Sequence, residues 1–226
     1  MSEKLVSFLI PSRNRFDSLL KAIGSIIKNT NDLSRVEVVL RFDEDDGYSL
    51  ARVDELPTND IDINITIGKR FGYVELHRYV NEMCRKTKGE FIAWFNDDCI
   101  VETKDWDNII AKYSGKLVSF YPNNKKTGSG NIFPIIHRKV FEILGHFSMA
   151  PQVDTWQFVV CNRAGIEIKR DDLVFIHNRK QDYISDDCRD AVLNKNSKTW
   201  SKTKQMRNKD TKKIKEYIKK HGNTIK

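Results

Sequence analysis

Two adjacent carboxylates, Asp97 and Asp98, follow the apolar run Phe91–Phe95. The run is typical of a buried strand, and carboxylates at its end cannot be buried without a counter-charge. A divalent cation supplies that charge, because Mg²⁺ and Mn²⁺ bind carboxylates together with phosphate oxygens. Asn96, Asp97 and Asp98 therefore predict a metal site that holds a phosphate, and an acidic turn or a helix N-cap is the alternative.

Two further polar clusters also follow apolar runs. Residues 12–15 (Ser-Arg-Asn-Arg) come after Leu5–Ile10 and Pro11, and residues 43–46 (Asp-Glu-Asp-Asp) come after Val36–Phe42. In open parallel sheets, ligands bind beyond the carboxyl ends of the strands. If these runs are parallel strands of one sheet, all three polar clusters lie at the same edge.

Helical patterns separate the strand-like runs. Apolar residues recur at helical spacing in Phe16–Lys28 and Tyr73–Thr87, and Ile61–Ile67 alternates isoleucine with polar residues, as a half-buried strand does. This alternation predicts an α/β fold: a mainly parallel sheet with helices on both faces. The second half is less regular, with three predicted strands and two predicted helices: Leu117–Tyr121, Ile132–Ile136, Leu173–Ile176, Lys139–Leu144 and Asp154–Ala164.

The 226 residues suit one large domain, or one domain followed by a tail. A hydrophobic fraction of 39% provides a core, and no apolar run reaches the roughly 18 residues that a membrane span needs. The N-terminus enters a strand-like run without a signal-peptide pattern, which predicts a cytoplasmic protein; peripheral attachment to a membrane is left open. The four cysteines are far apart in sequence and are expected to be reduced thiols.

The net charge of +8 is concentrated near the C-terminus. Lys195–Lys226 contains twelve basic residues and two acidic ones, and the rest of the chain is nearly neutral. From about Asp182 onward no apolar face is wide enough for a core. We expect a domain over residues 1–182, with halves of about 1–100 and 101–182, and a basic, partly helical extension over 183–226. Such a tail attracts DNA, an anionic membrane surface or acidic glycans, or it is merely solvated.

Four segments resemble family-2-type glycosyltransferases of GT-A fold. They are VSFLIPSRNR (6–15), KGEFIAWFNDD (88–98), IFPIIHRKVFEILGHF (132–147) and VDTW (153–156), in the order of that family's segments. The resemblance covers about residues 5–180. It implies a single Rossmann-like GT-A domain that moves a sugar from a nucleotide-diphosphate-sugar to an acceptor hydroxyl, such as that of a glycan, with Mn²⁺ or Mg²⁺.

The resemblance also implies a nucleotide pocket. One group of residues follows the first strand, and an acid after the second strand is expected to meet the base or ribose. A third contribution comes after the third strand, where relatives approach the nucleotide. The residues after the first strand are Pro11, Ser12 and Arg13. The acid after the second strand is Asp43 or Asp45, and the residue after the third strand is Arg70.

By the same resemblance, Asp98 is the metal ligand at the second Asp of an Asp-x-Asp motif, and Asp97 is its variable middle residue. Asn96 stands where the family usually has Asp, and its amide can still contact the ribose or a metal-bound water. His177, which ends the last predicted strand, is expected to be an additional metal ligand or a diphosphate contact. A hydrogen-bonded histidine at a strand end is the alternative.

Asp154 is the candidate general base. In an inverting transfer, a carboxylate takes the proton from the acceptor hydroxyl as that oxygen attacks the anomeric carbon. The family motif is usually Glu-Asp, and here only the Asp is present, after Val153. An N-cap for the following helix is the alternative role. The acceptor is expected to bind at the loops of residues 122–131 and 146–156.

Two other functions fit the same residues. A transferase that acts on a hydroxylated base in DNA, as virus-encoded enzymes do, would use the basic tail to contact phosphates. A non-catalytic module that binds nucleotides or polyanions would have kept the fold and lost the activity. The departures at Asn96 and Val153 motivate this last alternative.

Overall fold

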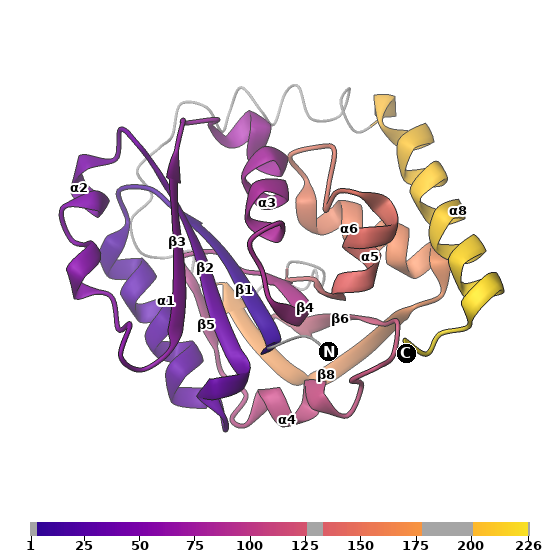
Figure 1. Cartoon of the computed structure of the whole chain (residues 1–226), viewed down its shortest axis with the longest axis horizontal. Helices are drawn as coiled ribbons and strands as arrows, with labels where there is room; N and C mark the ends of the chain where they lie inside the picture. The colour runs from indigo at the N-terminus through magenta and orange to yellow at the C-terminus, as the bar shows by residue number, and fades with distance from the viewer. Residues whose placement is uncertain (1–3, 126–132, 178–200, 226) are drawn as a thin grey trace.

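The computed structural model describes residues 4–125, 133–177 and 201–225 (Figure 1). One eight-stranded sheet has the strand order β3-β2-β1-β4-β7-β6-β8-β5. Its strands are β1 (Lys4–Ser12), β2 (Val36–Asp43), β3 (Asp62–Gly68), β4 (Gly89–Trp94), β5 (Cys99–Val101), β6 (Ser119–Asn123), β7 (Ile135–His137) and β8 (Glu167–His177). Most of the predicted loop at residues 123–130 lies outside the described residues.

The first half of the sheet is parallel throughout. β1 pairs with β2 and with β4, and β2 pairs with β3. In the second half β6 and β8 are parallel, whereas β7 is antiparallel to β4 and β6, and β5 is antiparallel to β8. The predicted α/β fold with a mainly parallel sheet is confirmed. The buried strands β1, β2 and β4 follow from continuous apolar runs, which are typical of parallel strands covered on both faces.

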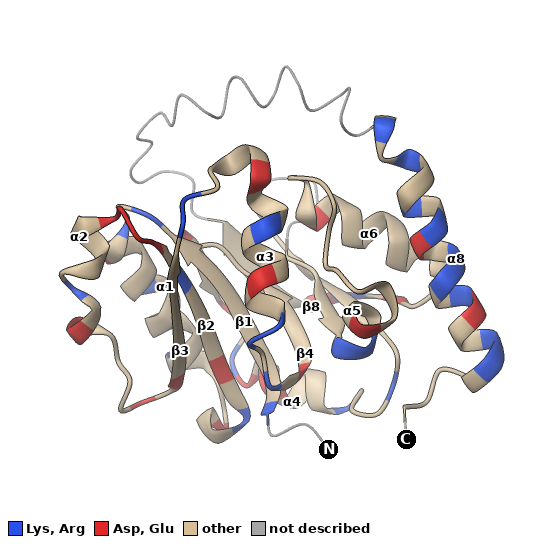
Figure 2. Cartoon of the chain, turned by 45° about the horizontal axis from the view of Figure 1, so that its top comes forward, with Lys and Arg blue, Asp and Glu red and all other residues tan. Residues whose placement is uncertain are grey.

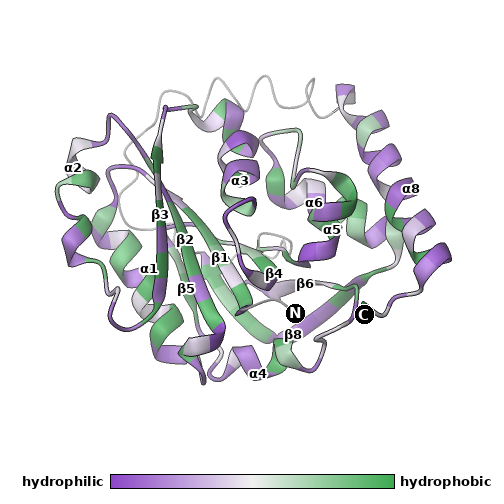
Figure 3. Ribbon diagram, in the orientation of Figure 1, coloured by the Kyte–Doolittle hydropathy of each residue, from purple (hydrophilic) through white to green (hydrophobic). Residues whose placement is uncertain are grey.

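Helices cover both faces of the sheet, as predicted, and each face has its own apolar core. α1 (Phe16–Asn29) and α4 (Trp106–Ala111) pack on one face, where the Phe8 ring lies 5.2 Å from the rings of Phe95 and Trp106. The other face is covered by four helices: α3 (Leu76–Cys84), α5 (Arg138–Leu144), α6 (Val153–Ala164) and α8 (Lys204–His221). In Figure 3, strands β1 and β2, which are largely green (hydrophobic), lie between the helices of the two faces.

Short elements complete the connections. α2 (Gly47–Leu50) follows β2, and the 3-10 turns are η1 (Leu33–Arg35), η2 (Val53–Glu55) and η3 (Tyr73–Glu75). The predicted helix at residues 73–87 is therefore η3 followed by α3. None of the helices in the described part of the chain is long and apolar enough to cross a membrane.

The C-terminal helix α8 corrects one expectation. The helical tail is present, but the expectation that nothing after Asp182 contributes to the core is wrong, because Ile214 is fully buried. α8 packs on α5 and α6, and its buried Asp210 carboxylate accepts a hydrogen bond from Trp156 Nε1 at 3.1 Å. Ile214, Tyr217 and Ile218 stand at helical spacing and pack on this core, but the lysines between them make the apolar stripe short and narrow. The predicted boundary between residues 182 and 183 lies outside the described residues and stays a prediction.

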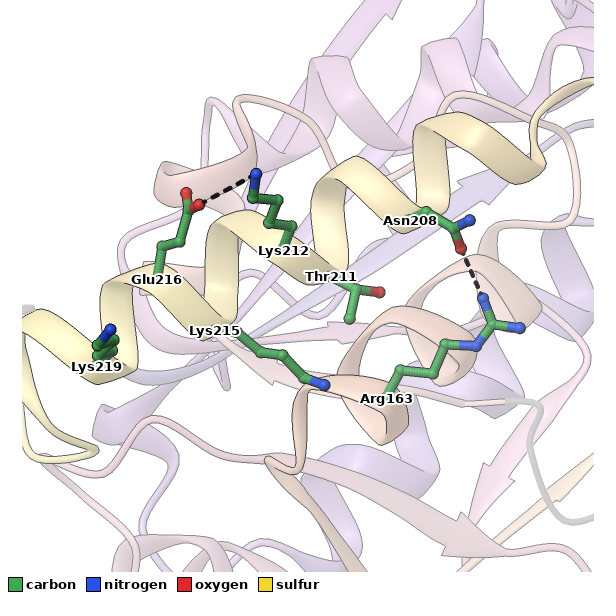
Figure 4. A pocket seen from close by; sticks show the side chains of 7 residues that line it. All are labelled: Arg163, Asn208, Thr211, Lys212, Lys215, Glu216 and Lys219. Carbon is green, nitrogen blue, oxygen red and sulfur yellow. Dashed lines mark hydrogen bonds and ion pairs between the residues drawn. The ribbon is translucent and has the colours of Figure 1, made fainter.

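Lysines recur along the whole length of α8 (Figure 2), and all of them are exposed. A groove lies between α8 and the end of α6 (Figure 4). Within it, Arg163 donates to Asn208 Oδ1 at 3.0 Å and Lys212 lies 3.7 Å from Glu216. The remaining lining residues are Thr211, Lys215 and Lys219. None of the residues predicted for the donor site lines this groove.

Candidate functional site

The site lies where β1, β2 and β4 end at the same edge of the sheet. Because these strands are parallel neighbours, the residues that follow them are brought together. The Ser12 hydroxyl, at the end of β1, donates to Asp97 Oδ2 at 2.8 Å. Arg13 lies 3.4 Å from Asp43, the last residue of β2. The three polar clusters therefore share one edge, as the sequence predicts.

Arg15 supplies the counter-charge for both carboxylates that follow β4. Its guanidinium nitrogens lie 3.1 Å from Asp97 Oδ1 and 2.8 Å from Asp98 Oδ2. Asn14, with a φ of 53°, adopts a left-handed conformation in the turn between β1 and α1, immediately before Arg15. Part of the counter-charge that the sequence pattern assigned to a divalent metal ion is therefore provided by an arginine.

The pKa values of the two carboxylates are shifted in opposite directions. Burial raises the pKa of Asp97 to about 7 despite the charge of Arg15, and the neighbouring Asp98 adds to the rise. Burial would also raise the pKa of Asp98, but the hydrogen bonds and charges of His177 and Arg15 lower it to about 2. Asp98 is thus the ionised carboxylate at neutral pH, and it is the better ligand for a cation.

His177 reaches Asp98 from the end of β8. β8 pairs with β5 so that His177 lies opposite Cys99, and His177 Nε2 lies 3.0 Å from Asp98 Oδ1. Ligand atoms of Asp98, Cys99 and His177 all lie within 4.8 Å of one another. Burial and the adjacent Asp98 raise the pKa of the Cys99 thiol well above its ordinary value, so it stays protonated. The Asp98 oxygen suits Mn²⁺ or Mg²⁺, and the imidazole nitrogen of His177 is a ligand typical of transition metals, so the pair fits Mn²⁺ better than Mg²⁺.

Of the two acids predicted to meet the nucleotide, Asp45 is the accessible one. Asp43 is buried and already accepts from Tyr79 at 2.9 Å and from Arg41 at 3.2 Å. The Asp45 side chain is 52% exposed and forms a two-point contact with Arg13, at 2.5 and 3.2 Å. The hydrogen bonds and charge of Arg13 lower the pKa of Asp45, which keeps it ionised.

The other predicted nucleotide residues lie at or just beyond the ends of β1, β3 and β4. Pro11 lies in β1 opposite Arg41 of β2, and its side chain is partly exposed. Arg70 is exposed after β3, and its charge acts on Asp45. Asn96 is partly buried between β4 and the acidic turn, and its carbonyl accepts from the Cys99 amide at 3.2 Å. All three lie beside the edge where the donor residues gather.

Asp154 lies in the first turn of α6 and is not its N-cap, which is Gln152. The Asp154 carboxylate accepts from the amide and hydroxyl of Thr155 at 2.7 and 3.3 Å. Burial raises its pKa, and the charge of His177 partly offsets this. His177 is one of the charged groups that act on Asp154, but the hydrogen bonds from Thr155 lower the pKa of Asp154 more. The alternative role of an N-cap is wrong.

Comparisons with known proteins identify the family. The sequence profile described as Glycosyl transferase family 2 matches residues 7–173. The chain belongs to glycosyl transferase family 2. A search of curated proteins gives no match.

Solved glycosyltransferase structures have the same GT-A fold. The mannosyltransferase PcManGT from Pyrobaculum calidifontis, in complex with GDP-Man and Mn²⁺, has a TM-score of 0.67 at 16% identity, covering 79% of this chain and 58% of its own. TarS 1–349 from S. aureus with UDP-GlcNAc has a TM-score of 0.62 at 15% identity, covering 80% and 61%. The same TarS segment with UDP has a TM-score of 0.63 at 13% identity, covering 76% and 60%. This family-2 chain thus spans about three fifths of the length of these structures.

Two residues of this family-2 site were assigned no role by sequence. Arg15 belongs to the predicted polar turn, but only the fold shows that it contacts both Asp97 and Asp98. Cys99 was predicted to be an ordinary reduced thiol, and it lies opposite His177 because β5 and β8 pair. No sequence signal pointed to these two contacts, because both depend on how the turn after β1 and the pairing of β5 with β8 place the side chains.

Proposed function

We propose that the chain transfers a sugar from a nucleotide-diphosphate-sugar to an acceptor hydroxyl, such as one on a glycan, with the help of Mn²⁺ or Mg²⁺. The observation that carries the proposal is the grouping of Asp98, His177 and Arg15 at the carboxyl edge of the sheet, beside Ser12 and Asp97. The GDP-Man and Mn²⁺ bound to PcManGT and the UDP-GlcNAc bound to TarS support this donor class.

The nucleotide is expected to bind over Ser12, Arg13 and Asp45. The exposed Asp45 carboxylate can accept hydrogen bonds from ribose hydroxyls, and its pairing with Arg13 keeps it ionised and in place. Arg70 adds a cation beside the same carboxylate. Asn96 is the expected polar contact between ribose and metal, in place of the acid that relatives carry.

Asp98 and His177 are the expected ligands of the cation, which would offset the charge of the departing diphosphate. Arg15 has a separate task, because it bonds the Asp98 oxygen that faces away from His177. It therefore orients the carboxylate and leaves Oδ1 on the histidine side. The guanidinium also adds a fixed positive charge next to the diphosphate. This charge favours both the binding of the donor and the departure of the diphosphate.

Asp154 is the proposed general base for the acceptor hydroxyl. Burial raises its pKa, which makes the carboxylate a stronger base, and the helix N-terminus favours its ionised form. The loop of residues 146–152 precedes it, and an acceptor bound there would bring its hydroxyl to the α6 N-terminus. Asp97, buried against Ser12, is a second acid at this edge and supports the turn rather than the acceptor.

The test is donor hydrolysis and transfer with a panel of nucleotide-diphosphate-sugars, with and without Mn²⁺. We expect one donor to be consumed only with the cation, and Asp98→Asn to lower the rate by about 10–100-fold or more, since changes that only support a metal ligand already cost that much. Asp54→Asn, an exposed carboxylate on η2, is the matched control and should keep the wild-type rate. Turnover that needs no metal ion and is retained in Asp98→Asn would contradict the proposed role of the metal.

A non-catalytic nucleotide-binding module is the second candidate, and the Arg15 contacts favour it, because they give both carboxylates an ion-pair partner without a metal ion. Nucleotide binding without turnover of any donor would select this candidate. The comparisons give no support to a DNA or other polyanion partner of the basic tail. That partner and the cytoplasmic location stay predictions.

A further inference from the structure

Among the described residues, no strand pairs with the outer side of the edge strand β3. β3 is the end strand of the sheet and pairs only with β2 among the described strands (Figure 1). The Gly68 carbonyl accepts from the Glu44 amide at 2.8 Å, so Gly68 points its backbone groups toward β2. Backbone direction alternates along a strand. The amides and carbonyls of Ile63, Ile65 and Ile67 therefore point away from the sheet.

The same residues present an apolar row. Side chains also alternate along a strand, so these three isoleucines share one face of the sheet. Ile65 is 36% exposed and Ile67 is 54% exposed. Between Asp62 and Lys69 the strand has no charged residue and no proline, the usual means of protecting an edge. An open backbone and exposed apolar side chains thus coincide on β3.

The strand is complementary to itself when a second copy pairs with it in the antiparallel direction. With Ile65 of each copy at a two-fold axis, Ile63 of one copy faces Ile67 of the other. In each of these pairs the two residues would exchange both amide–carbonyl hydrogen bonds. These bonds would use the outward-pointing backbone groups of Ile63, Ile65 and Ile67. A register slip of one residue pairs an outward-pointing residue with an inward-pointing one, so it is disfavoured.

Charge selects the same arrangement. β3 is preceded by the exposed Asp60 and followed by the exposed Lys69 and Arg70. In the antiparallel pair centred on Ile65, Asp60 of one copy faces Arg70 of the other. A parallel pair would place like charges together at both ends. We propose that β3 is a homodimer interface, in which a second copy of this chain extends the sheet across a two-fold axis at Ile65.

Sedimentation velocity over a concentration series tests the interface. A single strand pair buries little area, so we expect a monomer–dimer equilibrium with a Kd of about 1–100 μM. Ile65→Lys and Ile65→Glu each place like charges at the axis and should weaken self-association about 100-fold or more. Mixing the two variants opposes Lys to Glu and should restore dimers. Met206→Lys introduces a lysine in place of an exposed apolar residue of α8 and should leave the equilibrium unchanged.

Three outcomes would overturn the interface. One is a wild-type chain that stays monomeric up to about 300 μM, well above the expected Kd. Another is an Ile65→Lys variant that dimerises as the wild type does. The third is a mixture of the Lys and Glu variants that shows no heterodimer while both are folded by circular dichroism. The mixture keeps the test valid if either variant alone is destabilised, because the pairing should then raise its melting temperature.

Discussion

Adding one carbon atom at Gly89 tests how closely β1 and β4 pack beneath the site. A Cβ at Gly89 would lie 2.6 Å from both Ser7 N and Ser7 Oγ and 2.8 Å from the Val6 carbonyl carbon. Two of the three contacts are with backbone atoms of the interior strand β1, which cannot rotate aside. The substitution also disturbs the buried hydrogen bond from the Gly89 amide to Ser7 Oγ, which is 2.8 Å long.

Overpacking of this kind costs about 1–3 kcal/mol, and a disturbed buried hydrogen bond costs about 1 kcal/mol more. Part of this is offset by the lower unfolded-state entropy of alanine, so Gly89→Ala should destabilise the fold by about 2–3 kcal/mol. For a chain of this size that lowers Tm by about 4–12 °C. Gly24→Ala is the matched control, because a Cβ there meets nothing within 4 Å in the middle of α1.

Differential scanning calorimetry of the wild type and both variants is the assay. Gly24→Ala should raise Tm by about 1–4 °C, since alanine is favoured over glycine in helices by roughly 0.5–1 kcal/mol. Gly89→Ala melting within about 1 °C of the wild type would refute the close approach of β1 and β4. The same variant tests the site indirectly, because β1 ends at Ser12 and β4 leads into the turn that contains Asp98.

Three further predictions concern α8, acid stability and the proposed base. Asp210→Ala leaves the buried Trp156 Nε1–H without its acceptor and should cost about 1–3 kcal/mol, measured by urea unfolding. Burial would raise the pKa of Glu90, but hydrogen bonds from His137 and two further donors lower it from 4.5 to about 2. The stability it contributes is present above pH 4.5 and should be lost as pH falls toward about 2. Glu90→Gln should flatten the stability–pH curve in that window; a curve as steep as the wild type contradicts this. Asp154→Asn should keep donor binding and lower turnover by about two to four orders of magnitude; full turnover would place the base elsewhere.

The sequence predicted the strands that build the site because their apolar runs are continuous. Val36–Phe42 corresponds to β2, and Phe91–Phe95 corresponds to most of β4. β8 was predicted only at Leu173–Ile176, although it begins at Glu167, because its first half pairs with β6 while carrying charged, largely exposed side chains. β5 was not predicted at all, since three residues after an acidic turn form no period.

Within the site, the sequence located Ser12, Asp98 and His177, whose positions follow from strand ends in a parallel sheet. It did not locate the partner of the two carboxylates. The path of Arg15 depends on the left-handed turn at Asn14, and no local pattern fixes where a long arginine side chain ends. The pairing of β5 with β8, which brings His177 to Asp98, is a long-range contact that local periodicity does not encode.

Thermal-shift titration with nucleoside diphosphates, with and without Mn²⁺, tests the central claim that Asp98 and His177 would hold a cation that offsets the charge of a bound diphosphate. At a ligand concentration about 100-fold above Kd, binding adds about 2.7 kcal/mol, which corresponds to a Tm rise of about 5–11 °C. We predict this rise for at least one nucleoside diphosphate only when Mn²⁺ is present, and its loss in Asp98→Asn. An equal rise without Mn²⁺, retained in Asp98→Asn, would contradict the account.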